Sequence, residues 1–145
     1  MDEITVYEKA LALLARREHT EIELLRKLKA RHAPPSLITK TLQRLKQEGF
    51  LSHARFAEAY VRMRYQAGFG PQRIALELHE RGVEPHYQTS FLHSISPEEW
   101  KEKLTELWQK KFNGKTPANA SEKAKQMRFF YGRGFTLDQI KQVIN

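Results

Sequence analysis

The sequence predicts an all-α protein, built as a tandem array of three three-helix repeats of the helix-turn-helix type, elongated and curved. Apolar residues recur three and four positions apart along most of the chain, which is the spacing of a helix face. Helix-start and helix-stop residues divide the chain into nine segments, and these fall into groups of three over residues 1–51, 52–95 and 96–145. Because each group has few core residues of its own, we expect neighbouring groups to support one another in an extended array.

The first group contains three predicted helices. Thr5 to Glu8 reads Thr-x-x-Glu, a capping box, and predicts a first helix from that point. The same box at Thr20 to Glu23 predicts a second helix, which must end before the pair Pro34-Pro35. A third helix begins at about Pro35 and ends near Gly49, a residue suited to the left-handed conformation that often follows a helix.

The other two groups follow the same plan. Prolines stand at first-turn positions, where a missing N–H costs nothing, while serine and threonine stand at cap positions. The predicted starts are Ser52, Pro71 and Pro85 in the second group and Ser96 and Thr136 in the third, where a helix bearing Ala120 and Ala124 is expected after a loop with Gly114 and Pro117. Glycines at positions 68, 82 and 134 are the expected stops.

An internal repeat supports this grouping. When residues 20–42 are placed on residues 70–92, six positions match without a gap: Leu24 with Ile74, Leu28 with Leu78, Arg31 with Arg81, Ala33 with Val83, Pro35 with Pro85 and Leu42 with Leu92. A further shift of 52 residues places Gly82 on Gly134 and Val83 on Phe135. The third group is the most divergent, since its early helices align only with an insertion.

Length and composition exclude several classes of protein. The 145 residues include no cysteine, which rules out disulfides, thiolate nucleophiles and cysteine-bound metals. The longest apolar run, residues 10–15, is far shorter than the roughly 20 residues that cross a bilayer. The N-terminus also lacks the basic start of a secretory signal. We therefore expect a cytoplasmic protein without membrane contact.

No motif for catalysis or for a cofactor is recognised. Gly114-Lys115-Thr116 resembles the end of a phosphate-binding loop, but Gln109 stands where the opening glycine is needed. The six histidines do not form ligand pairs backed by carboxylates, and no nucleophile elbow occurs. The sequence thus predicts a protein that is not an enzyme and that uses no cofactor or metal.

The charge favours an anionic partner. Lys and Arg number 25 against 17 Asp and Glu, a net charge of +8. Seven basic residues and one acidic residue, Glu122, lie between positions 110 and 133, a density typical of a surface that meets phosphates or an acidic protein. The alternative is an ordinary solvated helix face. Aromatic residues nearby, such as Trp108 and Phe130, could stack on bases, although their helical spacing favours a core role.

Seven short strings, in order over nearly the whole chain, carry a more specific signal. They are Glu23-Leu24-x-x-Lys27-Leu28, Gly49-Phe50-Leu51, Arg55-Phe56-Ala57, Tyr60-Val61-x-x-Arg64, Gly70-Pro71-x-x-Ile74, Lys125-x-x-Arg128-Phe129 and Arg133-Gly134-Phe135. In type and spacing they resemble the RecX family, modulators of the bacterial RecA recombinase. The sequence departs from the family pattern at Ser52 and His53, where acidic residues are usual, but Ser52 can still cap a helix.

The resemblance implies tandem three-helix units without catalysis that bind the RecA filament on single-stranded DNA. Such binding would restrain ATP hydrolysis, strand exchange and co-protease activity, and so modulate recombination, DNA repair and the SOS response. A long, curved, basic monomer can follow a filament groove and add weak contacts along it. The residues expected to make these contacts are Arg26, Lys27, Arg64, Arg73, Lys123, Lys125, Arg128 and Arg133.

Two other functions remain open at this point. A helix-turn-helix transcriptional regulator would read bases with the third helix of a unit. The third segment of the middle unit, residues 85–95, has no Lys or Arg, which argues against that role. A purely structural helical adaptor would bind no nucleic acid and would leave a recombinase unaffected.

Overall fold

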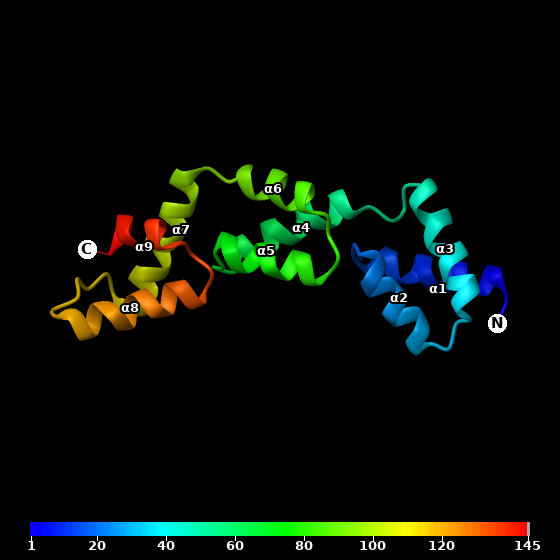
Figure 1. The fold of residues 1–145 in the computed structure, drawn as a ribbon, viewed down its shortest axis with the longest axis horizontal. Helices are drawn as coiled ribbons and strands as arrows, with labels where there is room; N and C mark the ends of the chain where they lie inside the picture. Colours follow the sequence, from blue (N-terminus) through cyan, green and yellow to red (C-terminus); the bar gives the residue numbers. More distant parts are fainter. Residues whose placement is uncertain (145) are drawn as a thin grey trace.

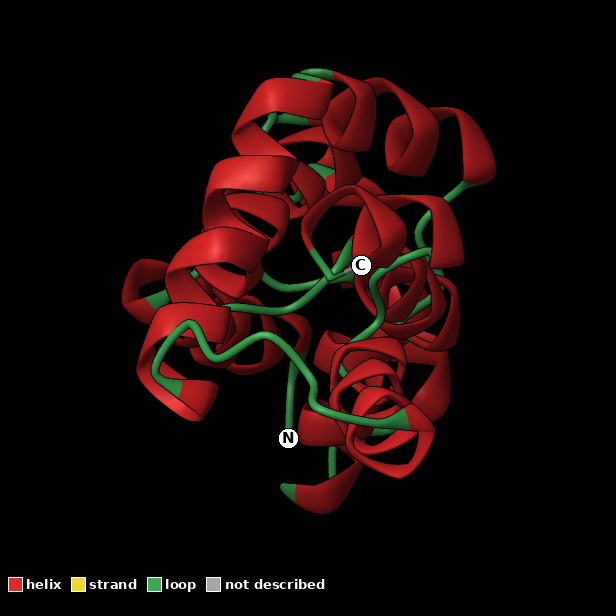
Figure 2. Cartoon of the chain, turned by 90° about the vertical axis from the view of Figure 1, so that its left-hand side faces the viewer, coloured by secondary structure: helices red, strands yellow, loops and turns green. Residues whose placement is uncertain are grey.

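The computed structural model describes residues 1–144, and all regular structure in that part of the chain is helical (Figures 1 and 2). The helices pack in three groups of three, and the groups follow one another in an elongated arch with the two termini near opposite ends (Figure 1), which confirms the predicted all-α array. They are α1 (Glu3–Arg16), α2 (Glu21–Ala30), α3 (Pro35–Gln47), α4 (His53–Gln66), α5 (Pro71–Glu80), α6 (Pro85–His93), α7 (Pro97–Phe112), α8 (Ala120–Gly132) and α9 (Leu137–Val143). None of them is both long and apolar enough to cross a bilayer.

The core is divided between two clusters of buried apolar side chains. The first lies among α1, α2 and α3 and includes Val6, Leu24 and Ile38, all fully buried. The second is continuous across α4 to α9 and joins side chains such as Ile74 and Phe130. Consequently the second and third repeats are united by apolar packing, whereas the first repeat has a core of its own.

Most helix starts are those predicted from the sequence. Capping boxes form at Thr20, Ser96 and Thr136. In each, the side-chain oxygen of the cap residue accepts a hydrogen bond from the N3 amide, and the N3 side chain accepts one from the amide of the cap residue. The predicted start at Thr5 is wrong. α1 begins at Glu3, and the Asp2 carboxylate accepts the Thr5 amide at 2.9 Å, because an aspartate three residues earlier is an equally good cap.

The second helix of each repeat ends in the same way, which supports the internal repeat. An arginine is followed by a residue with positive φ and then by a buried apolar residue, whose amide donates back to the helix at 3.0–3.2 Å. The three sets are Arg31-His32-Ala33, Arg81-Gly82-Val83 and Arg133-Gly134-Phe135. The left-handed position has φ 64° at His32, 78° at Gly82 and 100° at Gly134. The first repeat therefore carries a histidine where the other two carry glycine.

Replacing His32 by glycine is expected to stabilise the protein by about 0.5–1 kcal/mol, because a side chain with Cβ costs roughly 1–2 kcal/mol in the left-handed region. The gain is offset in part by the greater freedom of glycine in the unfolded chain. Urea unfolding measures it, and His32→Ala serves as the control that keeps Cβ and should give no gain. Equal stability of both variants would show that the backbone at this position is not strained.

Candidate functional site

The second helices of the repeats, α2, α5 and α8, lie along the lower side of the molecule in Figure 1, which is the concave side of the arch. Most of the basic residues singled out from the sequence belong to this side. Arg26 and Lys27 are on α2, Arg73 is on α5, Lys123, Lys125 and Arg128 are on α8, and Arg133 is the residue after α8. Arg64 is on α4. We call the exposed surface of α2, α5 and α8 the second-helix side.

Four of these side chains project into solvent without a partner. Within residues 1–144, the exposed Arg26, Lys123, Lys125 and Arg128 form no hydrogen bond or ion pair with another residue. Arg128 lies two positions from both Gln126 and Phe130, the buried residues of α8, and so points directly away from the core. Their charges are available for a polyanion.

The other three predicted arginines of the second and third repeats contact side chains of the protein itself. The guanidinium groups of Arg64, Arg73 and Arg133 lie 3.7, 4.7 and 4.0 Å from the centroid of the Phe69 ring. Arg64 donates to both carboxylate oxygens of Glu77, at 2.8 and 2.9 Å. The Glu77 carboxylate also pairs with Arg73 at 3.4 Å, while Arg133 has no carboxylate partner within residues 1–144, so the cluster keeps a net positive charge.

This arginine cluster connects the two repeats. Arg133 donates to the backbone oxygens of Gly68 and Ala67 at 3.1 and 2.9 Å, across the junction. Burial, and then the nearby Arg73 and Arg64, lower its pKa. Partial burial opposes ionisation of Glu77, but hydrogen bonds, chiefly from Arg64, outweigh it and lower the pKa of this carboxyl. Arg64, Arg73 and Arg133 therefore have structural partners, and their contact with another molecule remains a prediction.

Backbone hydrogen bonds fix the same junction. Gly70, the N-cap of α5, offers no capping side chain, and its amide instead donates to Arg133 O at 2.8 Å. The Gln72 amide donates to Gly134 O at 2.9 Å. The end of α8 thus caps the start of α5. A methyl group built on Gly70 would lie 2.3 Å from the Gly134 carbonyl carbon, so this approach requires glycine.

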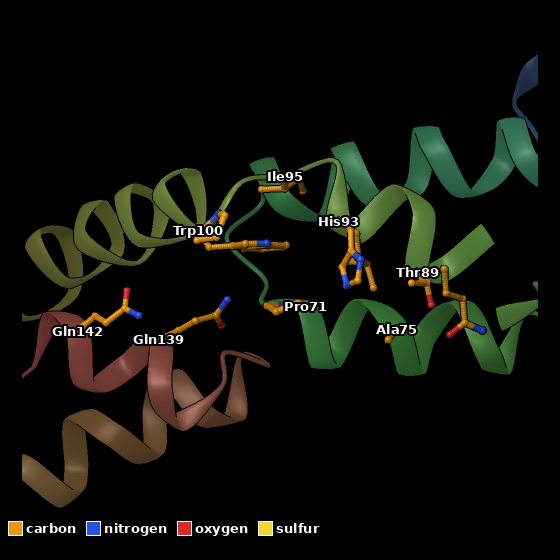
Figure 3. Close-up of a pocket in the computed structure, with 11 residues that line it drawn as sticks. Pro71, Ala75, Thr89, His93, Ile95, Trp100, Gln139 and Gln142 are labelled. Atoms are coloured by element: carbon orange, nitrogen blue, oxygen red, sulfur yellow. The ribbon is translucent and has the colours of Figure 1, made fainter. Parts of the chain in front are cut away.

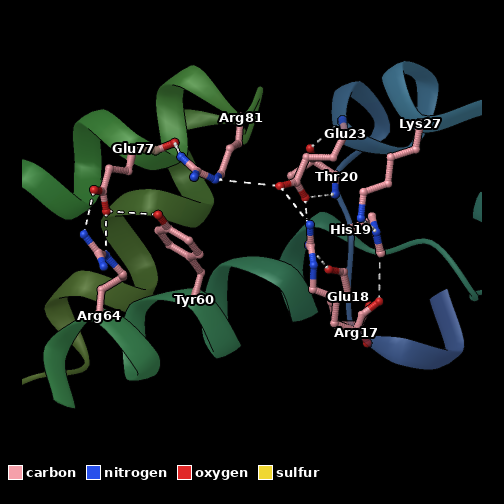
Figure 4. A network of polar contacts seen from close by, with 10 residues as sticks. All are labelled: Arg17, Glu18, His19, Thr20, Glu23, Lys27, Tyr60, Arg64, Glu77 and Arg81. Carbon is pink, nitrogen blue, oxygen red and sulfur yellow. Dashed lines mark hydrogen bonds and ion pairs between the residues drawn. The ribbon is translucent and has the colours of Figure 1, made fainter. Parts of the chain in front are cut away.

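The junction between the first and second repeats is polar (Figure 4). Arg81 lies 3.8 Å from Glu23, and Arg55 donates to Glu18 at 2.9 Å. His53 accepts the Glu21 amide at Nε2, at 3.0 Å, so its Nδ1 carries the proton that is donated to Glu84. His53 therefore joins the two repeats through Glu21 of the first and Glu84 of the second.

Lys27 also has an internal partner. Its ammonium group donates to His19 Nε2 at 2.9 Å, and Nδ1 of the same ring donates to Arg17 O at 3.0 Å (Figure 4). His19 is 1% exposed. Burial, and then the nearby charges of Arg17 and Lys27, lower its pKa, so the ring is neutral in the folded protein.

Stability should consequently fall as the pH is lowered from about 7.5 to about 5.5, because the unfolded chain protonates His19 near pH 6.5 while the folded chain resists it. The favourable contribution is complete above the unfolded pKa and is lost toward the lowered folded pKa. Urea unfolding at several pH values measures this slope. His19→Gln should flatten it, whereas His79→Gln, at an exposed histidine, should not; equal slopes in all three proteins would contradict the assignment.

A pocket of about 500 Å³ lies between the second and third repeats (Figure 3). Trp100, Ile95 and Pro71 line it together with His93, Gln139 and other residues of α5, α6, α7 and α9. Its lining has no carboxylate beside His93 and no nucleophile paired with a base. No group of three His, Cys, Asp or Glu side chains that could hold a metal ion occurs within residues 1–144. The residues that line the pocket come from four helices and from the turn between α6 and α7 that holds Ile95, and no sequence pattern marks them as neighbours.

Together, the arch and the repeated helix ends define a class: proteins made of tandem three-helix domains, here with exposed basic side chains on their second helices. Comparison with models of known protein families identifies the family within this class. Residues 7–45, 52–89 and 98–144 match the first, second and third three-helix domains of RecX. The chain belongs to the RecX family. These ranges fall within the three predicted repeats, whose exact ends remain a prediction.

Individual relatives agree. The regulatory protein RecX of Pseudomonas savastanoi pv. phaseolicola is 45% identical over 142 residues, covering 98% of this chain and 91% of its own. The regulatory protein RecX of Ectopseudomonas mendocina is 45% identical over 141 residues, which cover 97% of this chain and 93% of the relative. The crystal structure of RecX from Lactobacillus salivarius has a TM-score of 0.82 at 21% identity over 97% of this chain and 93% of its own, which shows the fold. The relatives carry the name of a regulator, not of an enzyme.

Proposed function

We propose that this protein is a cytoplasmic, monomeric regulator that binds the RecA filament on single-stranded DNA and inhibits RecA's ATPase, strand-exchange and co-protease activities. It would thereby modulate recombination, DNA repair and the SOS response without catalysing a reaction. The observation that carries the proposal is the set of unpartnered cations on the second-helix side, above all Lys125 and Arg128 on α8.

The physical basis is the match between an arched surface and a helical groove. A filament offers the same arrangement of protein and phosphate at each step, so three connected domains can make similar weak contacts in succession. Each contact with a phosphate releases counterions, which makes binding strongly dependent on salt.

The direct experiment adds the purified protein to RecA and single-stranded DNA and follows ATP hydrolysis. The proposal requires the rate to fall with increasing protein and to recover at higher salt. A rate that stays unchanged at saturating protein would refute the proposal. Sequence-specific binding to duplex DNA, with no effect on RecA, would instead indicate a helix-turn-helix regulator.

The double reversal Lys125→Glu/Arg128→Glu is expected to raise the protein concentration needed for half-inhibition by about tenfold or more. Each exposed cation that contacts a phosphate releases on the order of one counterion, and the reversal removes two such contacts. The helical circular dichroism should not change, because both side chains are exposed. The double reversal Lys101→Glu/Lys141→Glu on α7 and α9 alters the net charge equally and serves as control. Equal inhibition by both variants would count against α8 as the contact.

A further inference from the structure

A hollow of about 450 Å³ lies where α5 of the second repeat meets the end of α8 of the third. Two large apolar side chains on its rim are more than half exposed: Leu76, at 57%, and Tyr131, at 54%. Arg73, Glu80 and Gly132 complete most of the rim. Exposed apolar residues that flank a hollow on an otherwise charged surface mark an interaction site.

The fold does not require an aromatic residue at this position. Under the internal repeat, Tyr131 corresponds to His79 in the second repeat and to Lys29 in the first, and both are exposed. By contrast, the core positions keep apolar side chains in all three repeats, as Ala33, Val83 and Phe135 do. Tyr131 is thus a departure from the repeat at a position where packing makes no demand.

Basic side chains lie on both sides of the hollow, on α8 and on α5. Lys125, Arg128 and Tyr131 follow one another at three-residue spacing on α8, so the two free cations lie along the helix surface that reaches the tyrosine. On the opposite wall the Arg73 guanidinium lies 3.4 Å from the Gly132 carbonyl oxygen, next to Tyr131. Glu77, which also borders the hollow, is paired with Arg64 and Arg73.

We propose that this hollow binds an unpaired nucleobase, which stacks on the Tyr131 ring against Leu76 while Arg73, Arg128 and Lys125 hold the adjoining phosphates. The inference rests on the proposed function in that single-stranded DNA is the partner, and it assigns that DNA to a particular place on the protein. An aromatic platform beside a line of cations is how single strands are bound without reading sequence, because every base has a π face.

A photocrosslinking experiment tests the proposal. A single-stranded oligodeoxythymidine that carries one 5-iodouracil is irradiated with the full-length protein at low salt, and the crosslinked peptide is identified by mass spectrometry. We expect the crosslink at Tyr131, since iodouracil reacts with the aromatic ring on which it stacks. A crosslink confined to other residues, or no measurable binding of the oligonucleotide, overturns the proposal.

Affinity measurements make the result quantitative. Tyr131→Ala should weaken binding of the same oligonucleotide by at least about fivefold, while Tyr131→Trp should restore it, as expected for stacking on an aromatic ring. Phe50→Ala removes an aromatic side chain of similar exposure, 50%, in the first repeat and should leave affinity unchanged. Equal losses in Tyr131→Ala and Phe50→Ala overturn the proposal.

The RecA ATPase assay separates this inference from the proposed function. If the wild-type protein inhibits the filament but Tyr131→Ala binds the free strand normally, the nucleobase site is wrong and the regulatory function stands. If Tyr131 crosslinks but the wild-type protein leaves RecA unaffected, the nucleobase site stands and the regulatory function is wrong.

Discussion

Substitution of Gly134 by alanine is expected to lower the free energy of unfolding by about 3–5 kcal/mol, the combined cost of a left-handed backbone and of overpacking. The residue has φ 100°, and a methyl group there would lie 2.3 Å from the Cβ of Arg73 and 2.6 Å from its backbone nitrogen. The backbone would have to separate, which would break the hydrogen bond from the Gln72 amide to Gly134 O. Urea unfolding followed by circular dichroism measures the loss.

Two other glycines provide the controls. Gly132→Ala places its methyl group where nothing lies within 4 Å and φ is not positive, so it should be neutral or slightly stabilising. Gly49→Ala meets no atom either but has φ 79°, and should cost only the backbone penalty of roughly 1–2 kcal/mol. If Gly134→Ala costs no more than Gly49→Ala, the close approach of the second and third repeats is not what the structure indicates.

The second large effect is expected for Glu77→Ala, at about 2–3 kcal/mol of lost stability. The change leaves the guanidinium groups of Arg64 and Arg73 beside Phe69 without their carboxylate, in a place where Arg64 is 20% and Glu77 15% exposed. Removing one partner of a largely buried ion pair costs more than the pair itself contributes, because the remaining charge is left desolvated. The Tyr60 hydroxyl also loses the acceptor at 3.0 Å.

Glu58→Ala is the matched control, since Glu58 also pairs with an arginine, Arg62 at 3.2 Å, but with 53% and 64% of the side chains exposed. That pair should contribute well under about 1 kcal/mol. Thermal and urea unfolding of both variants compare the two pairs directly. Similar small losses in both variants would mean that the partial burial of the Glu77 ion pair adds nothing to the cost of breaking it.

Much of the fold could be predicted because its signals are local. Capping boxes, first-turn prolines and left-handed glycines depend on residues within one or two turns, and so they located most of the helix boundaries. The failure at Thr5 has the same origin, since Asp2 and Thr5 are both acceptable caps and only the structure shows which one accepts the amide. The repeat was visible because core positions keep their apolar character at fixed spacing.

The candidate site could be predicted only in part, because the partners of a charged side chain are distant in the sequence. Lys125 and Arg128 stand in a stretch with one acid and are exposed without a partner. Arg133 is in the same stretch, yet its guanidinium donates to Gly68 O, 65 residues away. Counting charged residues along the sequence cannot distinguish the exposed Lys125 and Arg128 from Arg133, whose partner is distant in the sequence. The joining of Gly70 to Gly134, and the hollow beside Tyr131, likewise arise from how two repeats meet.

The absence of cysteine in all 145 residues permits a direct test of the central claim, that the second-helix side meets the RecA filament. Single cysteines are introduced at exposed positions of the second helices (Lys29, His79 and Ser121) and, for comparison, of the third helices (Ser36, Ser90 and Gln142). The rate of thiol alkylation is then measured with and without RecA on single-stranded DNA. We expect the filament to slow alkylation several-fold in the first set and to leave the second set almost unchanged. Protection of the third-helix set alone, or of neither set, would contradict it.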